Sequence, residues 1–353
     1  MITTSGIPLS PRSLSDFVQR HGGIVKNDAH GVVRRLVPVQ RAAAGDLAPL
    51  LGARYVEDAF AAVARGAFLL IDEALAERPD VVTLPGWFHP FATWALAELL
   101  DVGDAPADDP IVGDGCKIGR GVVLMPRVRL GARVTIGAGA IIGEAGFGFA
   151  SGPNGATRAI PHLGGVVIED DVHIGALCTI SAGTISPTVI RRGAKLDAQV
   201  HVGHNCEIGE GTVIAAQSGL AGSVVIGRGV MMGGQVGVAD HVSIGDGARI
   251  AAKSGVIGDV AARSTVAGYP AVERQRWLRG LAELYKLASS RSAGTSSLAP
   301  SSGSMRVPSG FSSPPPPVAS SASNAPSSVR PEAIIRRSEP PSGRGSSDVD
   351  GGE

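Results

Sequence analysis

The chain has 353 residues, enough for two or three domains, and its 49 glycines are roughly twice the usual share. Lysine plus arginine and aspartate plus glutamate both number 32, which removes any global attraction to nucleic acid or to a membrane surface. Aromatic residues make up only 4% of the chain and hydrophobic residues 44%, so the core must be built from aliphatic side chains.

The cysteine pattern and the N-terminal residues indicate in which cellular compartment the protein is expected. Cys116, Cys178 and Cys206 are an odd set without a Cys-x-x-Cys spacing, which argues against a disulfide framework and a structural zinc site. The N-terminus lacks the charged and apolar segments of a signal peptide, and no apolar run approaches the ~20 residues of a membrane span. We therefore expect a soluble, cytoplasmic protein in a reducing compartment.

The N-terminal part, residues 1–105, has the pattern of a small α/β domain. Apolar residues at helical spacing predict helices over 14–20, 56–65 and 90–100, and an apolar run predicts a strand over 67–71. No motif in this part specifies chemistry by itself.

A six-residue period dominates residues 106–268. Aliphatic residues recur at this interval, mostly followed by glycine, and they form three runs: Val112, Ile118, Leu124, Leu130, Ile136 and Ile142; then Ile168, Ile174 and Ile180; then every sixth residue from Ile190 to Val256. A short strand followed by a glycine-permitted turn repeats in this way and stacks as a parallel β-helix. Three strands would close a triangular coil, with each aliphatic side chain inside and ~4.8 Å from its equivalent on the next coil.

Two interruptions break the period, and breaks in a solenoid are where loops leave the body and where function often gathers. The first covers residues 144–165. The second is a four-residue excess between Ile180 and Ile190.

The C-terminal part divides into two segments. Apolar spacing predicts a helix within residues 269–288, whose other face carries Arg274, Arg276 and Arg279. Such a face is either simply solvated or a landing site for an acidic carrier protein, with an attraction that falls with salt. Residues 289–353 are dominated by Ser, Pro, Gly and Ala and cannot bury enough apolar surface to fold, so we expect a disordered tail.

One constellation contains the parts for acyl transfer. His204 is the third residue of its hexad, Gly222 lies one coil above it, and Asp197 precedes it by seven residues. An imidazole can take a proton from an attacking amine or hydroxyl, a carboxylate can fix its tautomer, and a glycine N–H can approach an oxyanion. A histidine on a β-helix can also be a solvated turn residue. A metal site is not expected, because no third histidine follows His241 and catalytic zinc usually takes three protein ligands.

Six motifs occur in order along the chain: Gly143-Glu-Ala-Gly-Phe-Gly-Phe149, Ile160-Pro-His-Leu-Gly164, Gln199-Val-His-Val-Gly-His-Asn205, Leu220-Ala-Gly-Ser223, Gly233-Gly-Gln-Val-Gly237 and Ala239-Asp-His241. Together they resemble the UDP-3-O-(3-hydroxyacyl)glucosamine N-acyltransferase family of lipid A biosynthesis, within the hexapeptide-repeat acyltransferases. The likeness spans roughly residues 12–288, far more of the chain than a single motif would cover.

The resemblance implies a mainly β fold: a left-handed parallel β-helix behind a small N-terminal α/β domain that binds the nucleotide sugar. It also implies a homotrimer with active sites between adjacent β-helices. The acyl donor would be acyl carrier protein with its phosphopantetheine arm, without any other cofactor, and the acceptor would be the 2-amine of UDP-3-O-acylglucosamine.

By motif position, the resemblance implies that His204 is the general base, that Asp197 supports it, and that the Gly222 amide serves the oxyanion. The substrate-binding residues would be His241, Phe147, Phe149 and Tyr55, and the carrier-binding residues would be the three arginines of the C-terminal helix. Phe147 and Phe149 are equally compatible with packing on their loop.

The chain departs from the family pattern at two places. Ser181-Ala182 replaces the usual Asp-Arg, and Pro49 and Gly52 stand where an aromatic residue and an asparagine would contact uracil. Two other functions therefore remain open: an acyl- or acetyl-CoA-dependent N-acyltransferase acting on another nucleotide sugar, and a non-catalytic trimeric β-helix scaffold.

Overall fold

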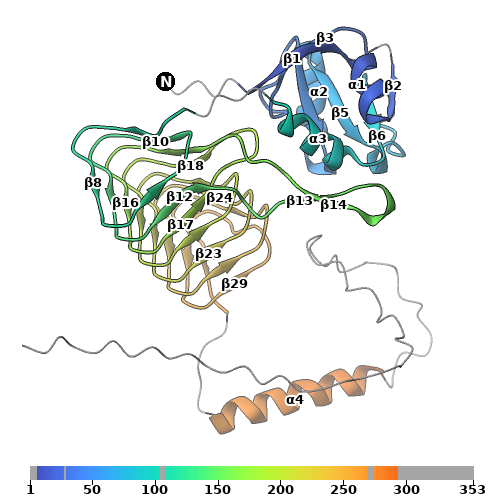
Figure 1. Ribbon diagram of the computed structural model, residues 1–353. Helices are drawn as coiled ribbons and strands as arrows, with labels where there is room; N and C mark the ends of the chain where they lie inside the picture. Colours follow the sequence, from blue (N-terminus) through green and yellow to red (C-terminus); the bar gives the residue numbers. More distant parts are fainter. Residues whose placement is uncertain (1–5, 28, 104–107, 269–273, 293–353) are drawn as a thin grey trace, which may run out of the picture. The chain divides into compact units, whose positions relative to one another are not determined.

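The computed structural model describes residues 6–27, 29–103, 108–268 and 274–292 (Figure 1). The N-terminal domain is built on a six-stranded sheet of order β1-β3-β4-β5-β6-β2. Its strands are β1 (Ile7–Ser13), β2 (Ile24–Lys26), β3 (Val32–Leu36), β4 (Asp46–Leu50), β5 (Phe68–Asp72) and β6 (Gly86–His89). Strands β3 to β6 run parallel, and β1 and β2 pair antiparallel at the two edges.

The helices of this domain are α1 (Leu14–His21), α2 (Val56–Ala64) and α3 (Ala92–Asp101), with short 3-10 turns η1 (Ala53–Tyr55) and η2 (Glu73–Leu75). All three helices and strand β5 lie where the sequence pattern predicts them. Helix α1 begins at a capping box, in which Ser13 Oγ accepts from the Asp16 amide and the Asp16 carboxylate accepts from the Ser13 amide.

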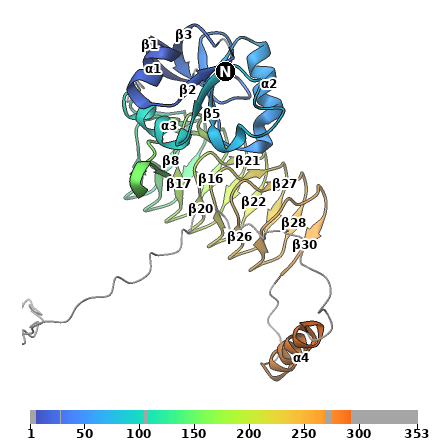
Figure 2. The ribbon, with the colours of Figure 1, turned by 90° about the vertical axis from the view of Figure 1, so that its right-hand side faces the viewer.

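Residues 111–266 form a left-handed parallel β-helix of hexapeptide repeats with three faces (Figure 2). The first face contains β7 (Ile111–Val112), β10 (Val128–Leu130), β15 (Val166–Ile168), β18 (Thr188–Ile190), β21 (Glu207–Ile208), β24 (Val225–Ile226) and β27 (Ser243–Ile244). The second contains β8 (Lys117–Ile118), β11 (Thr135–Ile136), β16 (His173–Ile174), β19 (Lys195–Leu196), β22 (Val213–Ile214), β25 (Met231–Met232), β28 (Arg249–Ile250) and β30 (Thr265–Val266). The third contains β9 (Val123–Leu124), β12 (Ile141–Glu144), β17 (Thr179–Ser181), β20 (His201–Val202), β23 (Gly219–Leu220), β26 (Gly237–Val238) and β29 (Gly255–Val256).

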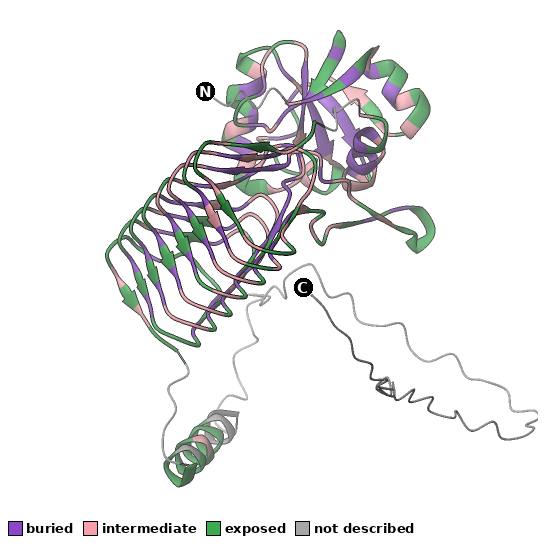
Figure 3. Ribbon diagram, turned by 60° about the vertical axis from the view of Figure 1, so that its left-hand side comes forward, coloured by how far each residue is buried: buried purple, intermediate pink, exposed green. Residues whose placement is uncertain are grey.

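The interior of the coil is the aliphatic ladder that the six-residue period predicts. Val202, Leu220 and Val238 lie in register on successive coils, and they are buried while their strand neighbours face outward (Figure 3). Three hexad residues differ from the prediction: Val112 is 49% exposed, Ile118 is 44% exposed, and Leu124 is only partly buried. All three belong to the first coil, which stacks on a neighbouring coil on one side only among the described residues.

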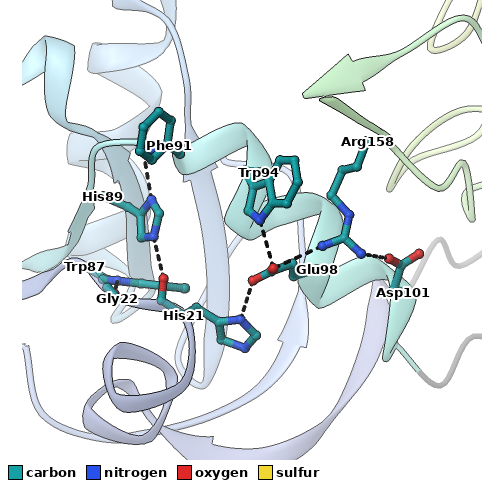
Figure 4. Close-up of polar contacts among 9 residues, drawn as sticks. All are labelled: His21, Gly22, Trp87, His89, Phe91, Trp94, Glu98, Asp101 and Arg158. Atoms are coloured by element: carbon teal, nitrogen blue, oxygen red, sulfur yellow. Dashed lines mark hydrogen bonds and ion pairs between the residues drawn. The ribbon is translucent and has the colours of Figure 1, made fainter. Parts of the chain in front are cut away.

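The first break in the period is a hairpin of β13 (Phe149–Ser151) and β14 (Thr157–Ala159), joined by η3 (Pro153–Gly155). The hairpin is fastened to α3 by Arg158, which pairs with Glu98 Oε1 at 3.1 Å and with the Asp101 carboxylate (Figure 4). The Arg158 guanidinium also lies 5.1 Å from the ring centre of Trp94, whose indole N–H donates to Glu98. These contacts tie the loop that interrupts the coil to the N-terminal domain.

Helix α4 spans Arg274–Ser292 and includes exposed Arg274, Arg276 and Arg279. It therefore runs four residues into the segment predicted as a tail, while residues 269–273 and 293–353 lie outside the described residues. None of the helices in the described part of the chain is long and apolar enough to cross a membrane.

Candidate active site

His204 lies at the corner of the coil between the third and first faces, and both breaks in the period leave from this same corner. Its Nδ1 is 3.0 Å from Asn205 Oδ1. The Asn205 amide group donates to the Ser186 carbonyl, and Oδ1 accepts from the Thr184 backbone N–H, so the carboxamide has one possible orientation. Because Oδ1 can only accept, Nδ1 of His204 carries the proton and Nε2 bears the lone pair.

Gly222 lies against the reactive edge of the His204 ring. A Cβ added at Gly222 would be 2.6 Å from His204 Nε2, so only glycine leaves room for the imidazole there. The Ser223 amide donates to the His204 carbonyl at 2.8 Å, which fixes the two coils in register. Within the described residues the Gly222 amide has no acceptor, so a lone-pair nitrogen and an available N–H lie side by side.

Asp197 is not brought to His204 within the chain. It lies at the corner between the second and third faces, where its exposed carboxylate accepts from the Ala198 amide at 2.7 Å. Asn205 makes the contact with His204 that the sequence analysis assigned to Asp197. The sequence offered one indication of this role, namely the asparagine directly after His204. Asn205 has a φ of 59°, a left-handed conformation that asparagine tolerates better than most residues.

Two of the predicted substrate-binding residues meet although they come from different domains. The Tyr55 hydroxyl is 3.4 Å from His241 Nδ1, and Arg54 reaches the His241 carbonyl at 3.5 Å. Burial, and then the charge of Arg54, lower the pKa of His241, against an opposing effect of Asp240. The His241 imidazole is therefore neutral at neutral pH.

Phe147 and Phe149 form an exposed aromatic pair on the loop after β12. Their ring centres are 5.1 Å apart at 69°, and the side chains are 87% and 58% exposed. They pack on each other rather than into the coil, so most of their apolar surface is available to a ligand or partner.

His162 is a histidine of the same corner that the sequence analysis quoted within a motif but assigned no role. Its ring centre is 4.9 Å from that of His204, and the side chain is 7% exposed. No periodic signal identifies such a residue, because it comes from the irregular loop between β14 and β15.

A cavity of about 480 Å³ lies beside the corner, between Gln40 and Arg41 of the N-terminal domain and the first face of the coil. Asn205 and Ser186 form part of its wall. Arg191 in that wall pairs with Glu169 and Glu207 at 2.9 and 2.6 Å, so its charge is already balanced by carboxylates. A ligand in this cavity would contact the residue that orients His204.

No group of three or more His, Cys, Asp or Glu side chains in the described ranges is arranged to hold a metal ion. Cys178 and Cys206 point into the coil, where their thiols donate to the carbonyls of Asp197 and Ala221. Burial raises the pKa of Cys206 to about 12, so this thiol is not a nucleophile at neutral pH.

Two repeat families match the coil. The family described as "Bacterial transferase hexapeptide (six repeats)" matches residues 109–144 and 187–222, and "Hexapeptide repeat of succinyl-transferase" matches residues 165–198 and 223–254. The solved structure of LpxA from Acinetobacter baumannii aligns with a TM-score of 0.41 at 25% identity, over 46% of this chain and 61% of that one.

The relatives named UDP-3-O-acylglucosamine N-acyltransferase include three bacterial proteins that cover different shares of this chain. The protein of Anaeromyxobacter dehalogenans is 45% identical over 53% of this chain and 54% of its own length, and that of Caulobacter vibrioides is 52% identical over 50% and 51%. The protein of Caulobacter sp. strain K31 is 36% identical over 80% of this chain and 96% of its own length. The chain thus spans about half the length of the first two relatives and nearly all of the third.

Proposed function

Because the chain belongs to the UDP-3-O-acylglucosamine N-acyltransferase family, we propose that it transfers a 3-hydroxyacyl group from acyl carrier protein to the 2-amine of UDP-3-O-acylglucosamine in lipid A biosynthesis. The observation that carries the proposal is the placement of the His204 ring, whose Nδ1 faces Asn205 Oδ1 and whose Nε2 lies against Gly222. This pairing supplies a base and an oxyanion donor at one point of the coil.

The reaction follows from these two groups. An amine attacks only in its neutral form, so the ammonium form present at neutral pH first releases one proton to solvent. His204 Nε2 takes a proton from the amine as its nitrogen bonds to the thioester carbonyl carbon, and the carbonyl oxygen becomes an oxyanion facing the Gly222 N–H. When the carbon–sulfur bond breaks, the pantetheine thiolate leaves and takes the proton from the His204 imidazolium, which restores the neutral ring.

The surrounding residues receive supporting roles in the same proposal. His241 and Tyr55 would position the sugar nucleotide, and the exposed Phe147 and Phe149 would contact its apolar part. Arg274, Arg276 and Arg279 of α4 would attract the acidic carrier protein. The active unit would be a homotrimer in the cytoplasm, where acyl carrier protein is found.

One alternative has a specific observation in its favour. Pro49 lies in β4 and Gly52 precedes η1, so the aromatic ring and the amide expected to contact uracil are missing from this chain. A CoA-dependent transfer to another amino sugar nucleotide would use the same His204. Incubation with acyl carrier protein or CoA donors, followed by mass spectrometry of the product, separates the two activities from each other and from a scaffold without product.

The first prediction tests the base. His204→Ala should lower turnover with UDP-3-O-acylglucosamine and a saturating acyl carrier by about 10²- to 10⁴-fold, the usual cost of removing a general base. The ring is half-buried and does not belong to the aliphatic core of the coil, so the thermal midpoint and oligomeric state should stay near those of the unsubstituted protein. Retention of most turnover would contradict the assignment of His204 as the base.

A further inference from the structure

The His162 ring is buried without a hydrogen-bond partner. Neither Nδ1 nor Nε2 has one among the described residues, although the side chain is only 7% exposed. The other buried histidine, His89, has both nitrogens satisfied by the His21 carbonyl and the Phe91 amide (Figure 4). An unsatisfied buried polar group destabilises the folded chain, so its presence calls for a role outside folding.

The unpaired ring lies next to the His204 ring. The two ring centres are 4.9 Å apart at 60°. A Cβ added at Gly146 would be 2.8 Å from His162 Nε2 and 2.7 Å from both Cβ and Cδ2 of His204. Nε2 of His162 and the Cδ2 side of the His204 ring, next to its Nε2, therefore share one glycine neighbour.

Two glycines of the loop after β12 lie against the His162 ring. Gly146 and Gly148 flank the His162 ring, and a Cβ added at Gly148 would be 3.1 Å from His162 Cε1. Phe147 between them is 87% exposed and contributes no packed side chain to the cover. Use of a His162 nitrogen by a ligand would need this loop to shift, because both ring nitrogens are covered in the structure.

The His162 ring is neutral under working conditions. Burial, and then the charge of His204, lower the pKa of His162 to about 4, and the Ile160 backbone opposes the shift without meeting hydrogen-bond geometry. A neutral imidazole has one nitrogen that accepts a hydrogen bond. An attacking amine has an N–H bond besides the one that His204 removes, and in a site shielded from water that N–H needs an acceptor.

We propose that His162 is a further active-site residue, whose ring nitrogen accepts a hydrogen bond from the acceptor amine while His204 removes a proton from the same amine. The inference rests on the proposed function and deepens it by naming a second residue for the amine. It also explains why a polar ring is kept where an apolar one would be more stable.

Two substitutions separate hydrogen bonding from packing. His162→Phe keeps a ring against His204 but removes both nitrogens, whereas His162→Gln keeps a hydrogen-bond acceptor and loses the ring. We expect His162→Phe to lower kcat/KM for the amino sugar nucleotide roughly 10- to 100-fold, with the KM for the acyl donor unchanged. His162→Gln should stay within a few-fold of the unsubstituted protein.

Thermal midpoints provide the second readout. His162→Phe should melt at or above the temperature of the unsubstituted protein, because it removes two unsatisfied atoms. The matched control, His89→Phe, should melt lower because it leaves the His21 carbonyl and the Phe91 amide unpaired.

Several results would overturn the inference. Unchanged kinetics in His162→Phe would mean that the nitrogens are not used. A lower melting temperature of His162→Phe, together with equal losses for amine and acyl donor, would assign the residue to packing. If the unsubstituted protein transfers no acyl group, the proposed function and this inference fail together; if it is active and only His204→Ala is impaired, this inference alone fails.

Discussion

At the scale of single residues, the tautomer of His204 is set by the side-chain amide of Asn205 rather than by a carboxylate of the same chain. A carboxylate next to the ring would stabilise the imidazolium with a full negative charge, while the Asn205 oxygen fixes the tautomer with only a dipole. The Asn205 carboxamide is itself held by Thr184 and Ser186, which belong to the second break in the hexad period. The four extra residues of that break therefore orient the base.

The second residue-scale prediction concerns His162 and pH. Its pKa of about 4 in the folded chain lies below the ordinary value of 6.5, so the unfolded chain binds more protons between these pH values. Above pH 6.5 the ring is neutral in both states and carries no ionisation penalty, and as the pH falls toward 4 the folded chain loses stability, by an amount on the order of 3 kcal/mol. The groups facing His162 are the titratable His204, the Ile160 backbone, and Gly146 and Gly148, which do not titrate.

Urea unfolding of the unsubstituted protein and of His162→Phe between pH 4 and 7 measures this contribution. His201 and His241 also have lowered pKa values and add a similar pH dependence to both proteins, so the difference between the two curves isolates His162. The advantage of the phenylalanine variant should grow as the pH falls. Parallel curves would show that the ring is not held neutral.

The sequence predicted one part of this residue constellation and missed another. The spacing of 18 residues between His204 and Gly222 is a property of the coil, so their contact follows from the repeat alone. Asn205 and His162 act through loops that leave the coil, and the path of an irregular loop has no periodic signal. Asp197 was assigned by its distance along the sequence and by motif position, and neither of these distinguishes one corner of a triangular coil from the next.

At the scale of elements, the hairpin β13–β14 connects two parts of the site. Its first strand follows the loop that contains Gly146 and Gly148, and its second strand precedes Ile160 and His162. Arg158 fastens this hairpin to α3 through Glu98 and Asp101. The orientation of the His162 loop therefore depends on contacts that the hairpin makes with α3.

Arg158→Ala should loosen the hairpin and displace the loop that carries His162. We expect faster cleavage within residues 149–159 in limited proteolysis and a fall in kcat/KM of ~10-fold or more, because small misplacements of reacting groups are costly. Arg78→Ala is the matched control, since Arg78 forms an ion pair of the same kind with Asp80 on an exposed surface outside the hairpin. Equal proteolysis and activity in the two variants would contradict the role of the hairpin contacts.

Strands and helices were predicted correctly where a repeating spacing of apolar residues continued over enough positions. The hexads fixed the strands of the coil, and helical spacing fixed α1, α2 and α3. The edge and central strands β1 to β4 and β6 were not predicted singly, because segments of three to seven residues between turns carry too few positions to establish alternation.

At the scale of the whole molecule, a single β-helix leaves an unusual amount of apolar surface outside. Val213 and Met231 lie in register on the second face and are 43% and 51% exposed, and Val225 on the first face is 46% exposed. Faces of this kind are covered in a symmetric assembly, and a threefold arrangement sets a corner of one coil against the neighbouring coil. Such an arrangement offers Asp197 a partner that it lacks within its own chain.

The last prediction is that Asp197 serves His204 of a neighbouring subunit. The two residues lie at different corners of one coil, so a contact between them within the chain is excluded by the geometry, whereas a homotrimer with a mass three times 35.8 kDa can bring the two corners together. Asp197→Ala and His204→Ala should each be impaired alone, because every site of either homotrimer lacks one of the two residues. When the two variants are co-expressed in equal amounts, about a quarter of the sites in random mixed trimers combine an intact His204 with an intact Asp197 from the neighbour, and we expect about that share of the activity to return.

Light scattering checks the trimer mass. A mixture of His204→Ala with Gly222→Ala is the control, and it should restore nothing because both residues belong to the same corner of the same chain. Failure of the first mixture to regain activity, with trimers present, would assign Asp197 a role confined to its own corner.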